Sequence, residues 1–143
     1  MRTFVVLAVS IVLVGILFCP MVMAAPSSIP ADLQIVQPDP SLPKELSSFF
    51  GKWEGRGRME YFLIVEKIDE QKASLYFWQS NPPGGGSGWM RYEAQVIKEG
   101  REYKLWFQFH LSDTEVTLKG EELDWSAGGF AKTNIRFKRV PLS

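Results

Sequence analysis

Cysteine and histidine are almost absent from this chain of 143 residues, which has one of each, Cys19 and His110. A disulfide needs two cysteines, so a single copy has no internal cross-link and must depend on its packed core. A metal site or a histidine-assisted nucleophile normally needs a second ligand or a positioned partner, and the sequence specifies none. We therefore predict no cofactor, no metal site and no enzymatic activity, and expect His110 to be a solvated residue.

The chain also lacks an excess of charge of either sign, because it has 16 lysines plus arginines and 16 aspartates plus glutamates. A nucleic-acid-binding protein needs basic residues gathered on one face to neutralise phosphates, and no basic stripe is present. A balanced net charge also gives no overall attraction to acidic membranes. We therefore expect no nucleic-acid partner and, once the N-terminal segment has been removed, no membrane partner.

Residues 3–31 contain no charged side chain, and most of them up to residue 25 are apolar. A charged start at Arg2, an apolar run and small residues at its end are typical of an export signal. Val22 and Ala24 fit the small-residue rule for cleavage. We predict that residues 1–24 are a signal peptide and that the mature protein is periplasmic or secreted.

Two alternatives to cleavage stay open at this point. The apolar run is long enough to span a bilayer, so an uncleaved segment would anchor the protein in the membrane. Cys19 would be a lipid-attachment site in a lipoprotein, but that chemistry normally needs a small residue just before the cysteine, and Phe18 is bulky.

Five prolines interrupt residues 25–43, which predicts an extended tether and places the folded domain at residues 44–143. Ser41 is expected to cap a short helix that Gly51 ends. The apolar stripe of this helix would consist of Leu46, Phe49 and Phe50.

Beyond Gly51 the sequence changes to short alternating runs that are separated by turn residues. Regular short connections of this kind predict an antiparallel up-and-down sheet, and about eight strands is the number that closes a small barrel. The expected strands are Lys52–Glu60, Tyr61–Ile68, Ala73–Ser80, Trp89–Ile97, Glu102–Leu111, Thr114–Leu118, Glu122–Trp125 and Thr133–Val140.

The alternation also predicts which side chains point into the barrel. On the first strand, Trp53 shares a face with Gly55 and Gly57, whose missing side chains would let the strand coil tightly. The inward sets of three later strands are Met90, Tyr92, Ala94 and Val96; Tyr103, Leu105, Phe107, Phe109 and Leu111; and Ile135 and Phe137.

The residues Gly51-Lys52-Trp53, placed after a short helix and at the start of the first strand, resemble the Gly-x-Trp signature of lipocalin and calycin barrels. The resemblance implies an all-β calycin-like barrel whose Trp53 plugs the closed end. It also implies that an arginine of the last strand lies across this tryptophan by a cation–π contact. Arg139 is the first choice for this arginine and Arg136 the second, because Arg139 has the parity of the inward Ile135 and Phe137.

The sequence points to two functions of different classes. The first is binding of a small apolar or amphipathic ligand by the inward side chains Met90, Tyr92, Tyr103, Phe107 and Phe109, with the Asn81–Gly88 loop at the mouth as a hinge or a lid. The second is a filled barrel that contacts an envelope protein or a glycan through Trp89 and Trp106, which fall on the polar-facing parity.

Glu66 is the one carboxylate whose position is ambiguous, because both faces of its strand are apolar. On the inward face it would be a buried acid that needs Arg56, Arg58 or a ligand as its partner. On the outward face it would form a surface salt bridge, which is the preferred interpretation.

Overall fold

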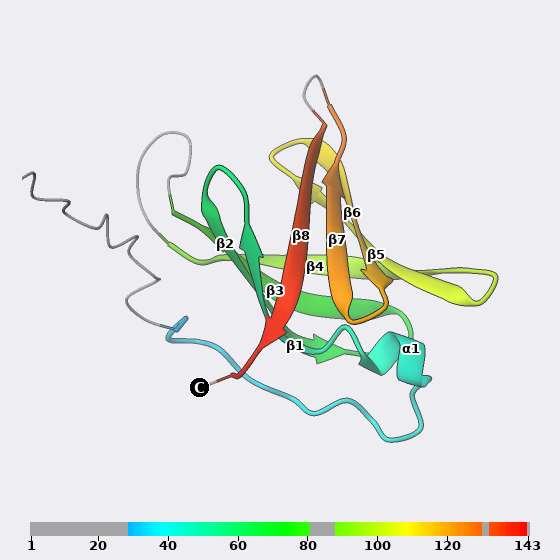
Figure 1. The fold of residues 1–143 in the computed structure, drawn as a ribbon. Coiled ribbons are helices and arrows are strands. Elements are labelled where there is room, and N and C mark those ends of the chain that lie inside the picture. The colour runs from blue at the N-terminus through cyan, green and yellow to red at the C-terminus, as the bar shows by residue number, and fades with distance from the viewer. Residues whose placement is uncertain (1–28, 81–87, 130–131, 143) are drawn as a thin grey trace, which may run out of the picture.

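The barrel is closed, as predicted: each of eight antiparallel strands pairs with the next along the chain, and the last pairs with the first. The structure is a computed structural model, and it describes residues 29–80, 88–129 and 132–142 (Figure 1). The elements are α1 (Lys44–Ser47), β1 (Gly51–Arg56), β2 (Glu60–Ile68), β3 (Lys72–Gln79), β4 (Met90–Glu99), β5 (Glu102–Phe109), β6 (Ser112–Lys119), β7 (Glu122–Ala127) and β8 (Thr133–Val140). This up-and-down order, with one short helix, is that of a calycin-like barrel.

The glycine-rich start of β1 follows the prediction only in part. At Gly55 an added Cβ would lie 2.8 Å from the Ile135 side chain and 3.0 Å from the Phe137 ring, so glycine is needed for β1 to approach β8. Gly57 is not on the strand, because β1 ends at Arg56 and Gly57 is an exposed turn residue.

The hairpin between β5 and β6 corrects a second expectation. Leu111 was predicted to point inward, but the chain reverses at His110 and Leu111, since Phe109 already pairs with Ser112. Both loop residues have positive φ, 46° at His110 and 65° at Leu111, as the type I′ turn of a two-residue hairpin requires. Leu111 is consequently 95% exposed.

The centre of the barrel is filled by aromatic rings that pack around Trp125. Its ring centroid lies 4.6 Å from that of Phe77, in a stacked arrangement, and 5.2 Å and 5.5 Å from Phe107 and Phe109, both edge-on. Phe137 completes the group at 6.3 Å. These rings have the spacing of a protein core, so the middle of the barrel is packed with side chains.

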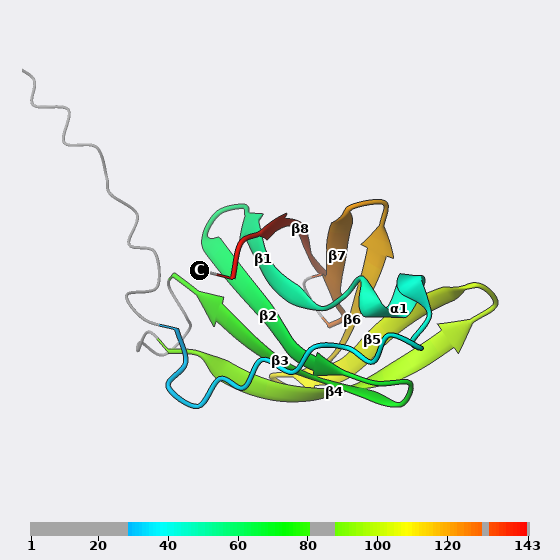
Figure 2. The same cartoon turned by 90° about the horizontal axis from the view of Figure 1, so that it is seen from below.

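Residues 29–43, here called the N-terminal strap, run along the outside of the barrel. In Figure 2, which views the molecule from below, this segment crosses in front of β2 and β3. The strap is fixed at one point of β2, where the Val36 amide donates to the Glu66 carbonyl at 2.8 Å and the Gln34 amide donates to its carboxylate at 2.9 Å. β2 is buried on both faces from Tyr61 to Glu66: the strap covers Glu66, and Phe62 packs against Trp78 and Trp89.

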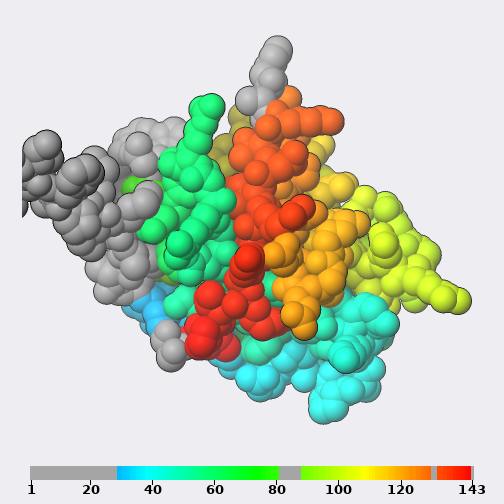
Figure 3. All heavy atoms as spheres, in the orientation of Figure 1, coloured from blue at the N-terminus to red at the C-terminus, as the bar shows by residue number. Residues whose placement is uncertain are grey.

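The strap continues into α1, whose start differs from the prediction. Pro43 occupies the N-cap position, and no side chain caps the helix. The Ser41 hydroxyl instead donates to the Asp39 carboxylate at 2.7 Å, so Ser41 belongs to the preceding turn. Leu46 and Phe49 are buried under the barrel as expected. Figure 3 shows α1 and the strap at one end of the molecule, opposite the projecting β1–β2 turn.

Candidate ligand-binding site

The barrel end beside α1 is plugged. Trp53 is fully buried, and its indole nitrogen donates to the Phe49 carbonyl at 3.0 Å. The guanidinium carbon of Arg139 lies 4.1 Å from the Trp53 ring centroid, which is the contact that the lipocalin resemblance implied. Access from this end is therefore blocked by the tryptophan and the arginine together.

Toward the opposite end, β4 and β5 separate from one another. Their ladder runs from Glu99↔Glu102 at the hairpin to Gln95↔Trp106, and no pair follows it within these fully described strands. The next positions, Ala94 with Phe107 and Tyr92 with Phe109, would continue the register but are not paired. The other seven seams are closed by pairing over most of their shared length. Beyond Gln95↔Trp106 these two described strands therefore have no ladder pairs, and this unpaired stretch of the seam is here called the β4–β5 gap.

Side chains fill the β4–β5 gap. The Tyr92 ring lies 5.2 Å from Phe107 and 5.7 Å from Phe109, measured between ring centroids. Its hydroxyl lies 3.5 Å from the Met90 sulfur, which is a weak hydrogen bond. Four of the five residues that the sequence predicted to line a ligand site thus lie together here.

Tyr103, the fifth predicted residue, lies elsewhere. It pairs with Lys98 near the β4–β5 hairpin, and the Lys98 ammonium lies 5.5 Å from its ring centroid. Alternation put Tyr103 on the correct face of β5 but did not show that it sits in the paired part of the seam, near the β4–β5 hairpin.

The gap has an apolar character with one hydroxyl group. Tyr92, Met90 and Phe109 are half-buried, and Phe107 is buried. Burial raises the pKa of the Tyr92 hydroxyl, because the phenolate would be poorly solvated there. The hydroxyl is therefore neutral at ordinary pH and is able to donate or accept one hydrogen bond. The predicted lid, Asn81–Gly88, lies outside the described residues except for Gly88.

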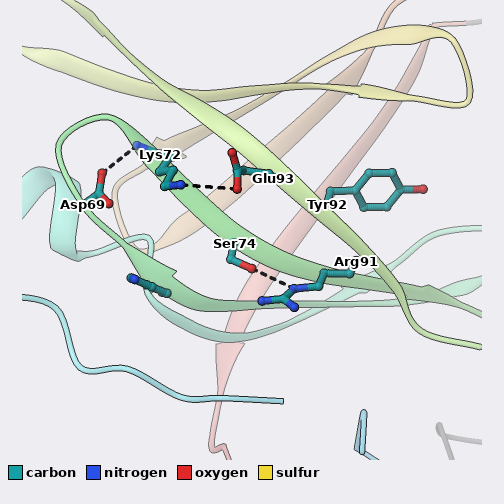
Figure 4. Close-up of a pocket in the computed structure, with 7 residues that line it drawn as sticks. Asp69, Lys72, Ser74, Arg91, Tyr92 and Glu93 are labelled. Atoms are coloured by element: carbon teal, nitrogen blue, oxygen red, sulfur yellow. Dashed lines mark hydrogen bonds and ion pairs between the residues drawn. The ribbon is translucent and has the colours of Figure 1, made fainter. Parts of the chain in front are cut away.

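A second hollow lies on the outer face of β3 and β4 and is charged (Figure 4). Lys72 contacts Glu93 at 3.6 Å, and the Arg91 side chain contacts Ser74 at 3.2 Å. Tyr92 also lines this hollow, but in Figure 4 its ring is turned away from the charged side chains. The lining has three basic side chains, Lys67, Lys72 and Arg91, of which Lys72 pairs with Glu93 and Arg91 with the neighbouring Glu66.

Glu66 lies beside this hollow and is almost fully buried, with 1% of its side chain exposed. Arg91 forms an ion pair with it at 2.6 Å, and the Ser74 hydroxyl donates to the same oxygen at 2.6 Å. The preferred interpretation, a surface salt bridge, is wrong about burial, and the proposed partners Arg56 and Arg58 are wrong. Glu66 faces outward but is covered by the strap, at a β-bulge where the register shifts between Val65 and Lys67.

The tryptophans proposed as exposed contacts are both half-buried. Trp89 packs with its ring centroid 6.5 Å from that of Phe62. Trp106 lies on the outer face of β5, between Gln95 of β4 and Glu115 of β6. His110 is an exposed turn residue whose ring is edge-on to Phe109 at 4.4 Å.

Two kinds of feature are absent from the described residues. No group of three or more histidine, cysteine or acidic side chains there is arranged to hold a metal ion. Within the same residues, no helix has the length and hydropathy needed to cross a bilayer. The predicted signal peptide, residues 1–24, lies outside the described part of the chain.

The similarity of this chain to known proteins is low. No protein-family model matches the chain, and no curated protein matches it. Two solved structures, both mutants of the fluorescent protein UnaG, align with 65% and 64% of this chain and with 96% of their own. Sequence identity is 11% in both cases, and the TM-scores are 0.44 and 0.45. Similarity at this level carries nothing about function, which has to be argued from the residues of the barrel.

Proposed function

We propose that this protein binds a small apolar or amphipathic molecule through the β4–β5 gap. The ligand would sit at the end of the barrel opposite α1, here called the open end. The observation that carries the proposal is the end of the β4–β5 ladder at Gln95↔Trp106, with the Tyr92 ring filling the space beyond it. A ligand that enters here has only side chains to displace.

Opening the wall of the barrel costs least where neighbouring strands share no hydrogen bonds. Each backbone hydrogen bond in a ladder contributes about 1 kcal/mol, so opening a paired seam by several residues costs several kcal/mol. Separating β4 from β5 beyond Gln95 breaks no ladder bonds, and it requires only that Tyr92 rotate away from Phe107 and Phe109. The gap is therefore the place where the wall opens at least cost.

The lining indicates the chemistry of the ligand. Methionine and phenylalanine side chains present apolar surface, and the neutral Tyr92 hydroxyl offers one hydrogen bond. None of the four lining residues is charged. A molecule with an apolar body and one polar group fits this surface, whereas a highly charged one would lose hydration without a partner.

The test is a fluorescence titration with a long-chain fatty acid and with an apolar dye. Binding should change the emission of Trp125, which lies 5.2 Å and 5.5 Å from Phe107 and Phe109. Tyr92→Ala should change the affinity about tenfold or more, while the control Tyr103→Ala should leave it unchanged. Equal effects of the two substitutions, or no response of the wild-type protein to any apolar ligand, would remove the proposal.

Export belongs to the same proposal, because the N-terminal segment has the pattern of a signal peptide. Mass spectrometry of the mature protein should find an N-terminus at Ala25 or Pro26. An intact Met1 would instead support a membrane-anchored protein, and a lipidated Cys19 a lipoprotein.

A second function, contact with an envelope protein or a glycan, is favoured by the packed interior and by the outward position of Trp106. Half-exposed tryptophans on a sheet face stack well on sugar rings. Titration with soluble envelope oligosaccharides distinguishes the two functions. Trp106→Ala would abolish an oligosaccharide response but leave fatty-acid binding intact.

A further inference from the structure

The β5–β6 turn contains a residue that neither stability nor the proposed ligand site explains. Leu111 is 95% exposed, whereas the next most exposed large apolar side chain of the described residues, Ile29, is 46% exposed. A leucine in this position gains nothing from burial and places an apolar side chain in water.

The backbone makes this choice of residue more unusual. Leu111 has φ of 65°, and the preceding His110 has φ of 46°. Two-residue hairpin loops of this conformation prefer Asn-Gly, since side chains branching at Cβ or beyond are disfavoured at positive φ. The turn therefore carries both strain and an exposed leucine, a combination that is found where a residue serves a function.

The position of the turn indicates what the leucine contacts. The β5–β6 turn projects at the end of the barrel opposite α1, the same end as the β1–β2 turn and the start of β8 (Figure 1). Arg58 in the β1–β2 turn and Lys132 before β8 are both exposed. Neither takes part in the ion pairs formed among the described residues. Two acids also lie at this end, the exposed Asp113 and the half-buried Glu60, so the basic side chains are the more exposed of the charged groups but not the more numerous.

We propose that the open end of the barrel docks on an anionic lipid surface, with Leu111 inserted among the acyl chains and Arg58 and Lys132 on the phosphates. An apolar side chain at a loop tip with flanking basic side chains matches the layered chemistry of such a surface, apolar below and anionic above. Net charge over the whole chain, which argued against a membrane partner, does not report this local arrangement.

The proposal is independent of ligand binding, and its test is made without ligand. The full chain, with Cys19→Ser, is reconstituted in vesicles, and an environment-sensitive fluorophore is attached either at T133C or at K119C. Thr133 lies at the open end at the start of β8, and Lys119 lies at the plugged end, and both are exposed. Quenching by nitroxide-labelled lipid then reports which end meets the bilayer, whatever the N-terminal segment does.

In vesicles of phosphatidylcholine with phosphatidylglycerol, quenching should be strong at position 133 and absent at position 119. Leu111→Gly should abolish it while the denaturation midpoint stays equal or rises, and R58Q with K132Q should reduce it severalfold. Phosphatidylcholine alone should give weak quenching. Equal quenching at the two positions, no quenching at position 133, or full quenching in the Leu111→Gly variant would overturn the proposal.

Discussion

Arg139 holds three parts of the chain together at the closed end of the barrel. Its guanidinium carbon lies 4.1 Å from the Trp53 ring centroid, and its terminal nitrogens donate to the carbonyls of Phe50 and Ser48, each at 2.6 Å. The contact therefore joins β8 to the start of β1 and to the end of α1, and it satisfies carbonyls that the short helix leaves unpaired.

Truncation of the plug should be among the most costly substitutions in the protein. Trp53→Ala should lower the free energy of unfolding by about 3–5 kcal/mol, because it removes a fully buried indole and leaves a cavity. Denaturant unfolding measures the change. The control Trp106→Ala, on the half-buried outer face, should cost clearly less. A Trp53→Ala cost below about 1 kcal/mol would mean that the plug does not hold the barrel closed.

The strap should depend on Glu66. Glu66→Ala removes the acceptor of the Gln34 amide and leaves Arg91 without its ion pair, so we expect a loss of about 1–3 kcal/mol. Hydrogen exchange should quicken at the Gln34 and Val36 amides while the β6 and β7 amides stay protected. Glu93→Ala, which breaks only the exposed pair with Lys72, should change stability by less than about 0.5 kcal/mol. Similar effects of the two substitutions would contradict the role of Glu66.

Because Leu111 has a strained backbone conformation, we expect that removing its side chain stabilises the fold. Leu111→Gly should raise the free energy of unfolding by about 1 kcal/mol, because glycine adopts positive φ freely and no buried contact is lost. Gly120 has φ of 65° in the β6–β7 turn, so Gly120→Leu places a leucine in the same conformation and should destabilise by a similar amount. A loss of stability in Leu111→Gly would show that the turn is not strained.

Alkaline pH should weaken the barrel partly through Tyr92. Burial raises its folded-state pKa above the ordinary tyrosine value of about 10. Between these two values the folded state binds more protons than the unfolded state, so stability falls as pH rises through this window. Tyr92→Phe keeps the ring and should show a smaller decrease in melting temperature from pH 8 to pH 11 than the wild type. An identical decrease would mean that the hydroxyl is solvated.

The fold was predictable because alternation is a strong signal when one face of a sheet is buried. In β5, Leu105 and Phe107 are buried while Lys104 and Gln108 face outward, and the pattern fixes the register. Trp53 and Arg139 were found through a three-residue motif together with the parity of β8. These features can be recognised in the sequence without knowing what packs outside the barrel.

Two of the failures depend on a partner distant in sequence, and the third on a turn that lacks the usual turn residues. The sequence around Glu66 predicts a surface residue, because it shows neither the strap that covers Glu66 nor the bulge that shifts its strand. The His110-Leu111 turn contains no glycine or asparagine, so no turn signal marked it. Residues 90–94 alternate like any paired strand, and nothing in them reveals that β5 has diverged.

The most direct test of ligand entry through the β4–β5 gap is the association rate of an apolar ligand when the gap is tied shut. In a Cys19→Ser chain, E93C and Q108C are joined by a short bis-maleimide, since these two exposed positions would oppose each other if the register continued beyond Gln95↔Trp106. The control joins Q108C to D113C across the paired β5–β6 seam. Stopped-flow fluorescence should show association slowed about tenfold or more by the first link and unchanged by the second. Equal rates in the two linked proteins would contradict entry through the gap.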